Sequence, residues 1–240
     1  MQPMEKYAII VAGGSGQRMG HKKPKQFIEV AGKPIIWHTV DSFLSCYDDM
    51  RVVLVLPLSY MTTGQELFQN QLASGSLQIV KGGENRFQSV KNGLQLVPAT
   101  AMVFVHDGVR CLVSHDLIRR CYSEAILLGN AVPAIAPPDS TRYINDEPSS
   151  ATVIEPHSRV IDRSRVRLIQ TPQTFPAAVL AEAFKQPYTE RFSDEATVVE
   201  SAGYKVNLVQ GDRSNIKVTY PEDLLIAERL IRNISNHLNS

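Results

Sequence analysis

The chain has 240 residues, of which 43% are hydrophobic and 20% charged, and its formal net charge is +1. This length suits one α/β domain, so we expect residues 1–240 to form a single unit. The balanced charge argues against binding of nucleic acid or of an anionic membrane. The apolar run at residues 7–11 is too short for a signal peptide and far short of the ~20 residues of a membrane span, so we expect a cytoplasmic protein. The cysteines, Cys46, Cys111 and Cys121, form no CxxC pair and no His-spaced cluster, which indicates neither a disulfide framework nor a structural zinc site.

Strand-forming apolar runs alternate with segments of helical periodicity along most of the chain. The expected strands are residues 7–11, 51–57, 77–82, 102–107, 131–137 and 205–211. The expected helices are residues 35–46, 62–73, 86–97, 114–129, 176–184, 194–203 and 221–233. Runs that are apolar on both faces and alternate with helices are typical of a mostly parallel sheet covered by helices on both faces. The sequence therefore predicts a doubly wound α/β fold.

Residues 139–165 interrupt this alternation. Short β-branched pieces, TRYI, ATVIE and RVID, are separated by the polar turn segment NDEPSS. This pattern predicts a hairpin-like β-arm that projects from the sheet.

The segment after the first expected strand has the composition of a phosphate-binding loop. Glycines at 13, 14 and 16 allow backbone N–H groups to approach phosphate oxygens closely. The dinucleotide fingerprint fails because Met19 stands where its third glycine belongs, and no GK[ST] follows to complete a P-loop. The nearby cations favour a nucleoside triphosphate over a dinucleotide, and they are Arg18, Lys22, Lys23 and Lys25. A glycine turn followed by a solvated basic stretch remains the alternative.

Two further strand ends carry polar residues. Asp107 ends the expected strand 102–107, where a carboxylate is costly unless it is paired or bound to a metal. Arg110 either binds a substrate phosphate or pairs with Asp107, and His106 is expected to be packed and hydrogen-bonded. The block GGENR at residues 82–86 either contributes to the same crevice or forms only a turn and a helix cap.

These blocks resemble a known family when they are taken together and in order. AGGSGQRMG followed by KPKQF is similar to the opening signature of nucleotidyltransferases with a Rossmann-like fold. The later blocks GGENRFQSV, VHDGVR, IDR, TPQTF, SDEA and NIKVTYPEDL resemble those of the 2-C-methyl-D-erythritol 4-phosphate cytidylyltransferase family nearly end to end. That family usually has HDAARP where this chain has HDGVRC, which raises the question of how the Gly108–Val109 backbone is held.

The resemblance implies transfer of CMP from CTP to a methylerythritol phosphate with release of pyrophosphate, in isoprenoid precursor synthesis and with Mg²⁺. It implies catalytic roles for Arg18, Lys25 and Lys217. It implies nucleotide-binding roles for Ala12, Gly13, Gly14, Ser15, Gly16, Gly83, Glu84, Ser89, Asp107 and Gly108, with Asp107 also the candidate metal ligand. It implies polyol-phosphate contacts for Arg110, Ser193 (in place of the family's usual Thr), Arg163, and Ser140 or Thr141. Arg163 is expected to reach the neighbouring subunit, so the arm implies a homodimer.

Other functions stay open at this point. The nearest alternative is ribitol 5-phosphate cytidylyltransferase, a sister family that shares most of these blocks. The presence of Arg18, Lys25, Asp107 and Lys217 argues against a regulatory protein that binds a nucleotide without turnover. Met19 and the number of cations near the glycine loop argue against an NAD-dependent oxidoreductase.

Overall fold

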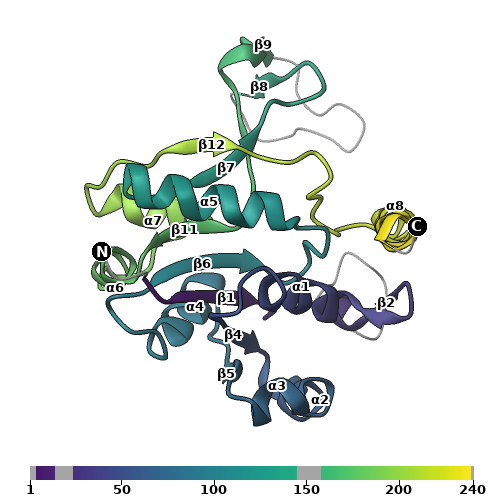
Figure 1. The fold of residues 1–240 in the computed structure, drawn as a ribbon. Helices are drawn as coiled ribbons and strands as arrows, with labels where there is room; N and C mark the ends of the chain where they lie inside the picture. Colours follow the sequence, from purple (N-terminus) through teal and green to yellow (C-terminus); the bar gives the residue numbers. More distant parts are fainter. Residues whose placement is uncertain (1–3, 14–23, 145–157, 239–240) are drawn as a thin grey trace.

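The computed structural model describes residues 4–13, 24–144 and 158–238 (Figure 1). A five-stranded sheet forms its centre, with strand order β11-β6-β1-β4-β5. The strands are β1 (Lys6–Val11), β4 (Met50–Leu56), β5 (Leu77–Lys81), β6 (Met102–Asp107) and β11 (Gln173–Pro176). All neighbours in it pair in parallel except β11, which runs antiparallel to β6. The first four expected strands and the mostly parallel sheet are confirmed.

Helices cover both faces of this sheet. The helices are α1 (Ile35–Leu44), α2 (Met61–Leu67), α3 (Gln69–Ala73), α4 (Arg86–Leu94), α5 (His115–Leu128), α6 (Ala177–Ala183), α7 (Glu195–Ser201) and α8 (Pro221–Leu238). Side chains of α1 and α5 pack with Ala8 and Ile10 of β1 on one face, whereas α4, α6 and α7 pack with Ile9 on the other. Because successive strand residues point to opposite faces, one strand serves two cores. The doubly wound fold is thereby confirmed.

The last two expected strands belong to a second sheet. Strands β7 (Val132–Ile135), β10 (Leu168–Ile169) and β12 (Leu208–Gln210) pair in the order β10-β7-β12. A single bridge between Ala131 and Thr174 links this sheet to β11. Strand propensity predicts where these two strands form. It does not predict which strands they pair with, because the partners lie far away in sequence and are selected by tertiary packing.

Most helices differ from the expected bounds by a few residues, and two of the differences have a local physical reason. The helix expected at residues 62–73 is interrupted at Phe68, which leaves helical geometry (φ −118°, ψ 27°) and is 1% exposed in the core. Helix α7 begins at Glu195, one residue after the expected start at 194, because Asp194 caps it in a capping box with Thr197.

Two short hairpins complete the fold, β2 (Glu29–Val30) with β3 (Lys33–Pro34), and β8 (Arg142–Ile144) with β9 (Ser158–Val160). The β8–β9 hairpin projects at the top of Figure 1, so the described part of the expected arm is confirmed. Helix α8 lies at the right of the view, and its Ala227 shares a small core with Val30 and Ile35.

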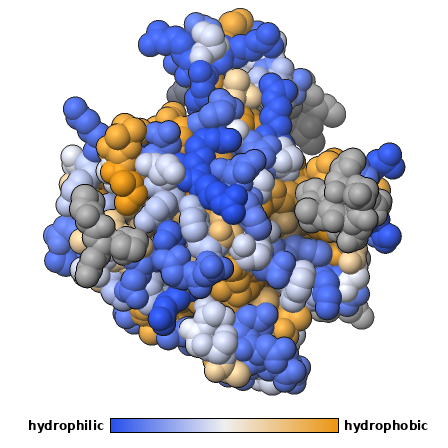
Figure 2. Space-filling view, viewed as in Figure 1, coloured by the Kyte–Doolittle hydropathy of each residue, from blue (hydrophilic) through white to orange (hydrophobic). Residues whose placement is uncertain are grey.

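Large apolar side chains are exposed on the arm, at Tyr143, Ile144 and Val160, and on β10, at Leu168 and Ile169. An apolar patch at the left of Figure 2 lies over the C-terminal end of α5, where Ile126, Leu127 and Leu128 are exposed. Among the described helices, none has the length and hydrophobicity that a bilayer crossing requires.

Candidate active site

The site begins where β1 and β6 end side by side. Val11, the last residue of β1, pairs with Asp107, the last residue of β6. The Gly108 N–H donates to the Val11 carbonyl at 2.9 Å. The start of the glycine loop therefore lies next to the Asp107 carboxylate, at the carboxyl edge where parallel sheets bind ligands.

Three cations surround the Asp107 carboxylate, which is 8% exposed. Lys217 Nζ lies 3.0 Å and Arg110 Nε 3.4 Å from Oδ2, and Arg86 Nε lies 3.5 Å from Oδ1. Burial by itself raises the pKa of the Asp107 carboxyl, but the charges of Arg86, Lys217 and Arg110 outweigh burial and hold this pKa well below its usual range. Asp107 is therefore a carboxylate throughout the physiological pH range.

Two of these cations are fixed by further partners. Both terminal nitrogens of Arg86 donate to the carboxylate of Glu195, with Arg86 Nη2 2.9 Å from Glu195 Oε2. Arg110 Nη1 donates to the Asn215 carbonyl at 2.8 Å. Burial lowers the pKa of the Arg86 guanidinium, but Glu195 and then Asp107 raise it above its ordinary value, so Arg86 stays charged. Lys217 differs, because its side chain is 44% exposed.

A cavity of about 170 Å³ opens beside this cluster. It is lined by Arg86, Asp107, Arg110, Ile169, Gln170, Thr171, Gln173, Ser193, Asp194 and Lys217. The structure thus brings together four residues that the sequence had singled out, Asp107, Arg110, Ser193 and Lys217, from three distant segments. Arg110 both pairs with Asp107 and faces the cavity, so the two roles considered for it are compatible.

Lys25 approaches the same region from the other end of the glycine loop. It lies on the 3-10 helix Lys25–Phe27, and its Nζ donates to the Val218 carbonyl at 3.0 Å. Val218 follows Lys217 directly and is fully buried. Two of the predicted catalytic cations are therefore anchored to the same short segment.

Ser89 connects two predicted nucleotide-binding segments. Its hydroxyl donates to the Asn85 carbonyl at 2.9 Å and accepts from the Gly83 N–H at 3.1 Å. A Cβ atom added at Gly13 would lie 3.5 Å from the Ser89 Oγ, so the glycine loop begins beside this hydroxyl. At Gly83 an added Cβ would lie 2.2 Å from Gln88 Cγ, so this turn has no room for a side chain.

The contacts of Gly108 bear on one of the three positions, 108, 109 and 111, at which this chain departs from the family's HDAARP. A Cβ at Gly108 would lie 2.7 Å from Ile36 Cδ1 and 3.0 Å from Ala12 Cβ. The Gly108 carbonyl accepts from the Thr39 hydroxyl at 3.2 Å. The segment is thus held by backbone contacts, and the space of the family's alanine is taken by Ile36.

His106 is packed and hydrogen-bonded, as expected. It is fully buried, its Nδ1 lies 2.9 Å from the Thr171 hydroxyl, and its Nε2 lies 3.2 Å from the Arg110 carbonyl. Burial lowers the pKa of this imidazole to about 4. It has no access to a substrate and supports the Asp107 and Arg110 backbone instead.

Some predicted site residues are placed elsewhere or not described. Gly14, Ser15, Gly16 and Arg18 lie outside the described residues. Glu84 is exposed in the turn between β5 and α4. Ser140 is exposed and Thr141 half-buried at the base of the arm, and Arg163 is exposed beyond β9, so none of these three lines the cavity.

Sequence reasoning missed Arg86, Gln173, Asp194 and Glu195 as members of this site. Gln173 donates to Asp194 Oδ2 at 2.9 Å and accepts from the Ala196 N–H at 2.8 Å, which fixes the start of α7 against β11. The available signal was the presence of Arg86 in GGENR and of Glu195 in SDEA, both at the start of a helix after a polar turn.

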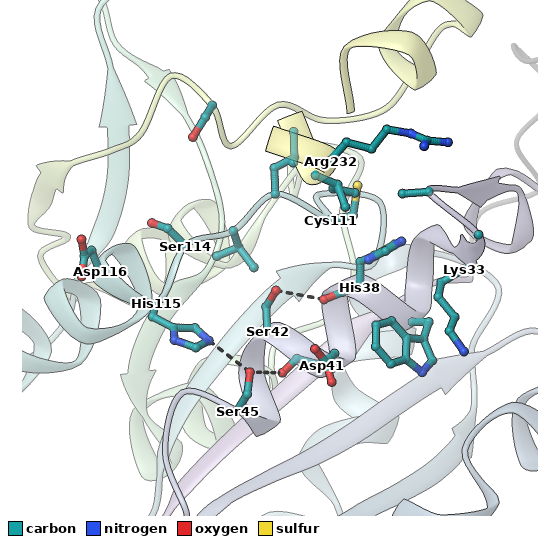
Figure 3. Close-up of a pocket in the computed structure, with 17 residues that line it drawn as sticks. Lys33, His38, Asp41, Ser42, Ser45, Cys111, Ser114, His115, Asp116 and Arg232 are labelled. Atoms are coloured by element: carbon teal, nitrogen blue, oxygen red, sulfur yellow. Dashed lines mark hydrogen bonds between the residues drawn. The ribbon is translucent and has the colours of Figure 1, made fainter. Parts of the chain in front are cut away.

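A second, larger cavity of about 1300 Å³ lies between α1, the start of α5 and α8 (Figure 3). His38, Asp41, His115 and Arg232 are among its lining residues, and the His115 ring bonds to the Ser45 hydroxyl at 3.1 Å. None of the predicted site residues is among the described residues that line it. We therefore assign the active site to the smaller cavity, which collects the charged groups.

The described residues define a Rossmann-like α/β protein with a carboxylate set among three cations at the carboxyl edge of its parallel strands. Residues 7–233 match the profile of the family described as 2-C-methyl-D-erythritol 4-phosphate cytidylyltransferase. The chain belongs to this family and is a cytidylyltransferase. The predicted family and transfer activity are confirmed, and the ribitol phosphate, regulatory and oxidoreductase alternatives are set aside.

Individual relatives agree over almost the whole length. The chain is 42% identical over 228 residues to the 2-C-methyl-D-erythritol 4-phosphate cytidylyltransferase of Phocaeicola vulgatus, which covers 95% of this chain and 100% of that one. It is 43% identical over 228 residues to the enzyme of the same name from Porphyromonas gingivalis, with 95% and 98% covered. The crystal structure of the enzyme of that name from Thermus thermophilus is similar with a TM-score of 0.74 at 30% identity, covering 96% of this chain and all 100% of that one.

Proposed function

We propose that the Asp107 cluster and the adjoining glycine loop transfer the CMP unit of CTP to 2-C-methyl-D-erythritol 4-phosphate. An oxygen of the methylerythritol phosphate attacks the α-phosphorus of CTP, the bond to the β-phosphate oxygen breaks, and pyrophosphate leaves with that electron pair. The observation that carries the proposal is the convergence of Lys25 and the Lys217–Asp107 pair on one segment at the carboxyl edge of the sheet. The product would be an isoprenoid precursor.

The arrangement fits a reaction that needs charge and position but no general base. The attacking phosphate is already anionic at neutral pH, and the buried His106 takes no part. Catalysis then depends on holding the reacting groups in line and stabilising the charge that develops on the phosphates. Lys25, Lys217 and Arg18 are the cations that we assign to this task.

The nucleotide is assigned to the first loop and to the turn before α4. Gly13, Gly14, Ser15 and Gly16 offer backbone donors to the triphosphate, and Ala12, whose own N–H donates to the Val55 carbonyl, holds the start of the loop. Gly83, Glu84, Ser89, Asp107 and Gly108 are assigned to the cytosine and ribose. The Ser89 hydroxyl, which lies beside Gly13, supports this division because it links the two segments.

The methylerythritol phosphate is assigned to the cavity that Arg110 and Ser193 line. Arg163, Ser140 and Thr141 are not among the described residues that line this cavity, and we assign Arg163 and Ser140 or Thr141 to the site of a second subunit. The exposed apolar side chains of the arm and β10 support the same homodimer, since burial of such a patch favours association. A cytoplasmic location completes the proposal.

Magnesium is the metal that we assign to the reaction. Groups of three or more His, Cys, Asp or Glu side chains suited to a metal are not found among the described residues, so a cage made by protein alone is not indicated there. Mg²⁺ commonly takes one or two carboxylates together with substrate phosphates and water. Asp107 would serve as such a carboxylate once the exposed Lys217 turns from Asp107 Oδ2 to the substrate phosphates. When bound, the ion would neutralise charge on the phosphate oxygens.

Parallel assays test the proposal directly. The purified protein with Mg²⁺ and CTP is offered 2-C-methyl-D-erythritol 4-phosphate or ribitol 5-phosphate, and both pyrophosphate and the CDP-polyol are measured. We expect turnover with the first substrate and little with the second. Equal or greater turnover of ribitol 5-phosphate would contradict the substrate assignment.

A further inference from the structure

Gln26 is a buried polar residue whose side chain reaches the start of the glycine loop. It is 1% exposed and lies between Lys25 and Phe27 on the same 3-10 helix. Its Nε2 donates to the Ala12 carbonyl at 2.6 Å, inside the protein. The bond joins the residue that precedes the glycine loop to the helix that follows it.

Both ends of this contact are firmly placed. Phe27 is 1% exposed and stacks on Tyr60 with ring centroids 4.8 Å apart, which holds the 3-10 helix against the core. Ala12 is 4% exposed, and its N–H donates to the Val55 carbonyl of β4 at 3.0 Å. Neither end can shift far without disturbing packed residues, so the amide of Gln26 sets a defined geometry.

The orientation of one peptide group follows from this bond. In a planar trans peptide the carbonyl and the N–H point in opposite directions. Because the Ala12 carbonyl points to Gln26, the N–H of Gly13 in the same peptide points away from it. Gly13 is exposed and lies beside the Ser89 hydroxyl, so this N–H is directed away from the packed side chain of Gln26 at an exposed residue.

We propose that Gln26 is a positioning residue that presets the Gly13 N–H for the triphosphate and fixes Lys25 at the correct distance from the loop. Gln26 itself touches no substrate. It acts on the first end of the loop through the Ala12 carbonyl, and on the second through its chain neighbour Lys25, whose ammonium is held at the Val218 carbonyl. The inference rests on the proposed placement of CTP in this loop.

The test is CTP binding by the full-length Gln26→Met protein, measured by calorimetry with Mg²⁺ and without the second substrate. Methionine fills a similar volume but donates no hydrogen bond. We expect the Kd for CTP to rise about tenfold or more, because a buried carbonyl is left without its donor and the loop is released. We also expect kcat to fall while the KM for 2-C-methyl-D-erythritol 4-phosphate stays within about twofold, since Arg110 and Ser193 are untouched.

Gln186→Met is the matched control. Gln186 donates to the carbonyls of Ala183 at 2.8 Å and Val198 at 3.1 Å, between α6 and α7 and away from the cavity. We expect this variant to lose stability but to bind CTP as the wild type does. If Gln26→Met fails to fold, Gln26→Asn replaces it in the test. Asparagine keeps a buried amide, but its side chain is one methylene shorter and no longer reaches the Ala12 carbonyl.

Three outcomes would overturn the inference. The first is normal CTP affinity in either folded Gln26 variant. The second is an equal loss of CTP affinity in Gln26→Met and Gln186→Met, which would show only a general loss of structure. The third is a rise of the KM for 2-C-methyl-D-erythritol 4-phosphate in Gln26→Met by the same factor as the Kd for CTP. If the wild-type protein binds CTP but does not turn over the polyol phosphate, the proposed reaction is contradicted. The effect of Gln26 on CTP binding can still be measured in that case.

Discussion

The ammonium of Lys25 lies 3.0 Å from the carbonyl oxygen of Val218, although 193 positions separate the two residues in sequence. This contact joins the segment after the glycine loop to the segment that presents Lys217 to Asp107. It places Lys25 and Lys217, two cations that we assign to catalysis, against the same segment.

Removing either lysine should abolish most turnover while leaving the fold intact. Lys25→Ala and Lys217→Ala are each expected to lower kcat on the order of 10²–10³-fold, because each deletes a charge placed for the transition state. Pyrophosphate release measures the loss, and circular dichroism checks the fold. Lys185→Ala is the control, because Lys185 forms its ion pair with the exposed Glu182 and is itself 70% exposed. Near-normal turnover in Lys25→Ala or Lys217→Ala would contradict the mechanism.

Arg163→Ala should lose activity toward the polyol phosphate while CTP binding is largely kept. Arg163 is exposed on the arm and does not line its own chain's cavity, so we assign it to the second subunit. Mixing the inactive Arg163→Ala and Lys217→Ala proteins after subunit exchange should restore activity, because each mixed dimer holds one site with both residues. Two inactive proteins that stay inactive despite verified exchange would place Arg163 outside the partner's site.

Gly108→Ala should be harmful, and a smaller residue at position 36 should relieve the harm. The added methyl group meets Ile36 Cδ1 at 2.7 Å, and overpacking of this kind costs about 1–3 kcal/mol. Ile36→Val removes that atom, so the double variant should be more stable than the sum of the single effects by at least about 0.5 kcal/mol. Urea unfolding of the four proteins measures the coupling. If the changes in unfolding free energy of the two single variants simply add in the double variant, the contact with Ile36 is not the reason that residue 108 is a glycine.

Stability should fall with acid in a way that depends on His106. The folded pKa, lowered by burial to about 4, lies below the ordinary value of 6.5, so the unfolded chain binds the proton more readily. The contribution of neutral His106 is complete above pH 6.5 and is lost as the pH falls toward 4. Over that window the wild type should lose up to roughly 3 kcal/mol more than His106→Gln, which has no charge to bury. Equal pH slopes of the unfolding free energy in the two proteins would refute the assignment.

The order of elements was predictable because it depends on local pattern. Ser114 accepts from the Leu117 N–H at 3.2 Å as the cap of α5, and Gly129 ends that helix with a φ of +88°. Both residues carry their signal in the sequence alone, since cap geometry involves only near neighbours. The motif order likewise identified the family before any coordinate was known.

The surroundings of Asp107 were only partly predictable. Its position at a strand end could be read from the alternation of apolar runs, but the pairing of Arg86 with Glu195, 109 positions away in sequence, could not. When a buried carboxylate and its counter-ion lie on different helices, no periodic pattern in the sequence indicates that they pair. The same holds for Gln26, whose amide looks like an ordinary polar residue until the fold brings it to the Ala12 carbonyl.

The sequence by itself determined the doubly wound plan and the family, and it pointed to Asp107, Arg110 and Lys217, because these depend on composition, spacing and local pattern. Only the tertiary structure decided which cations meet at Asp107, why residue 108 is a glycine, and that β7 and β12 leave the central sheet. The physical reason is that such contacts join distant segments, where side-chain packing and burial select one arrangement among many that the sequence pattern allows.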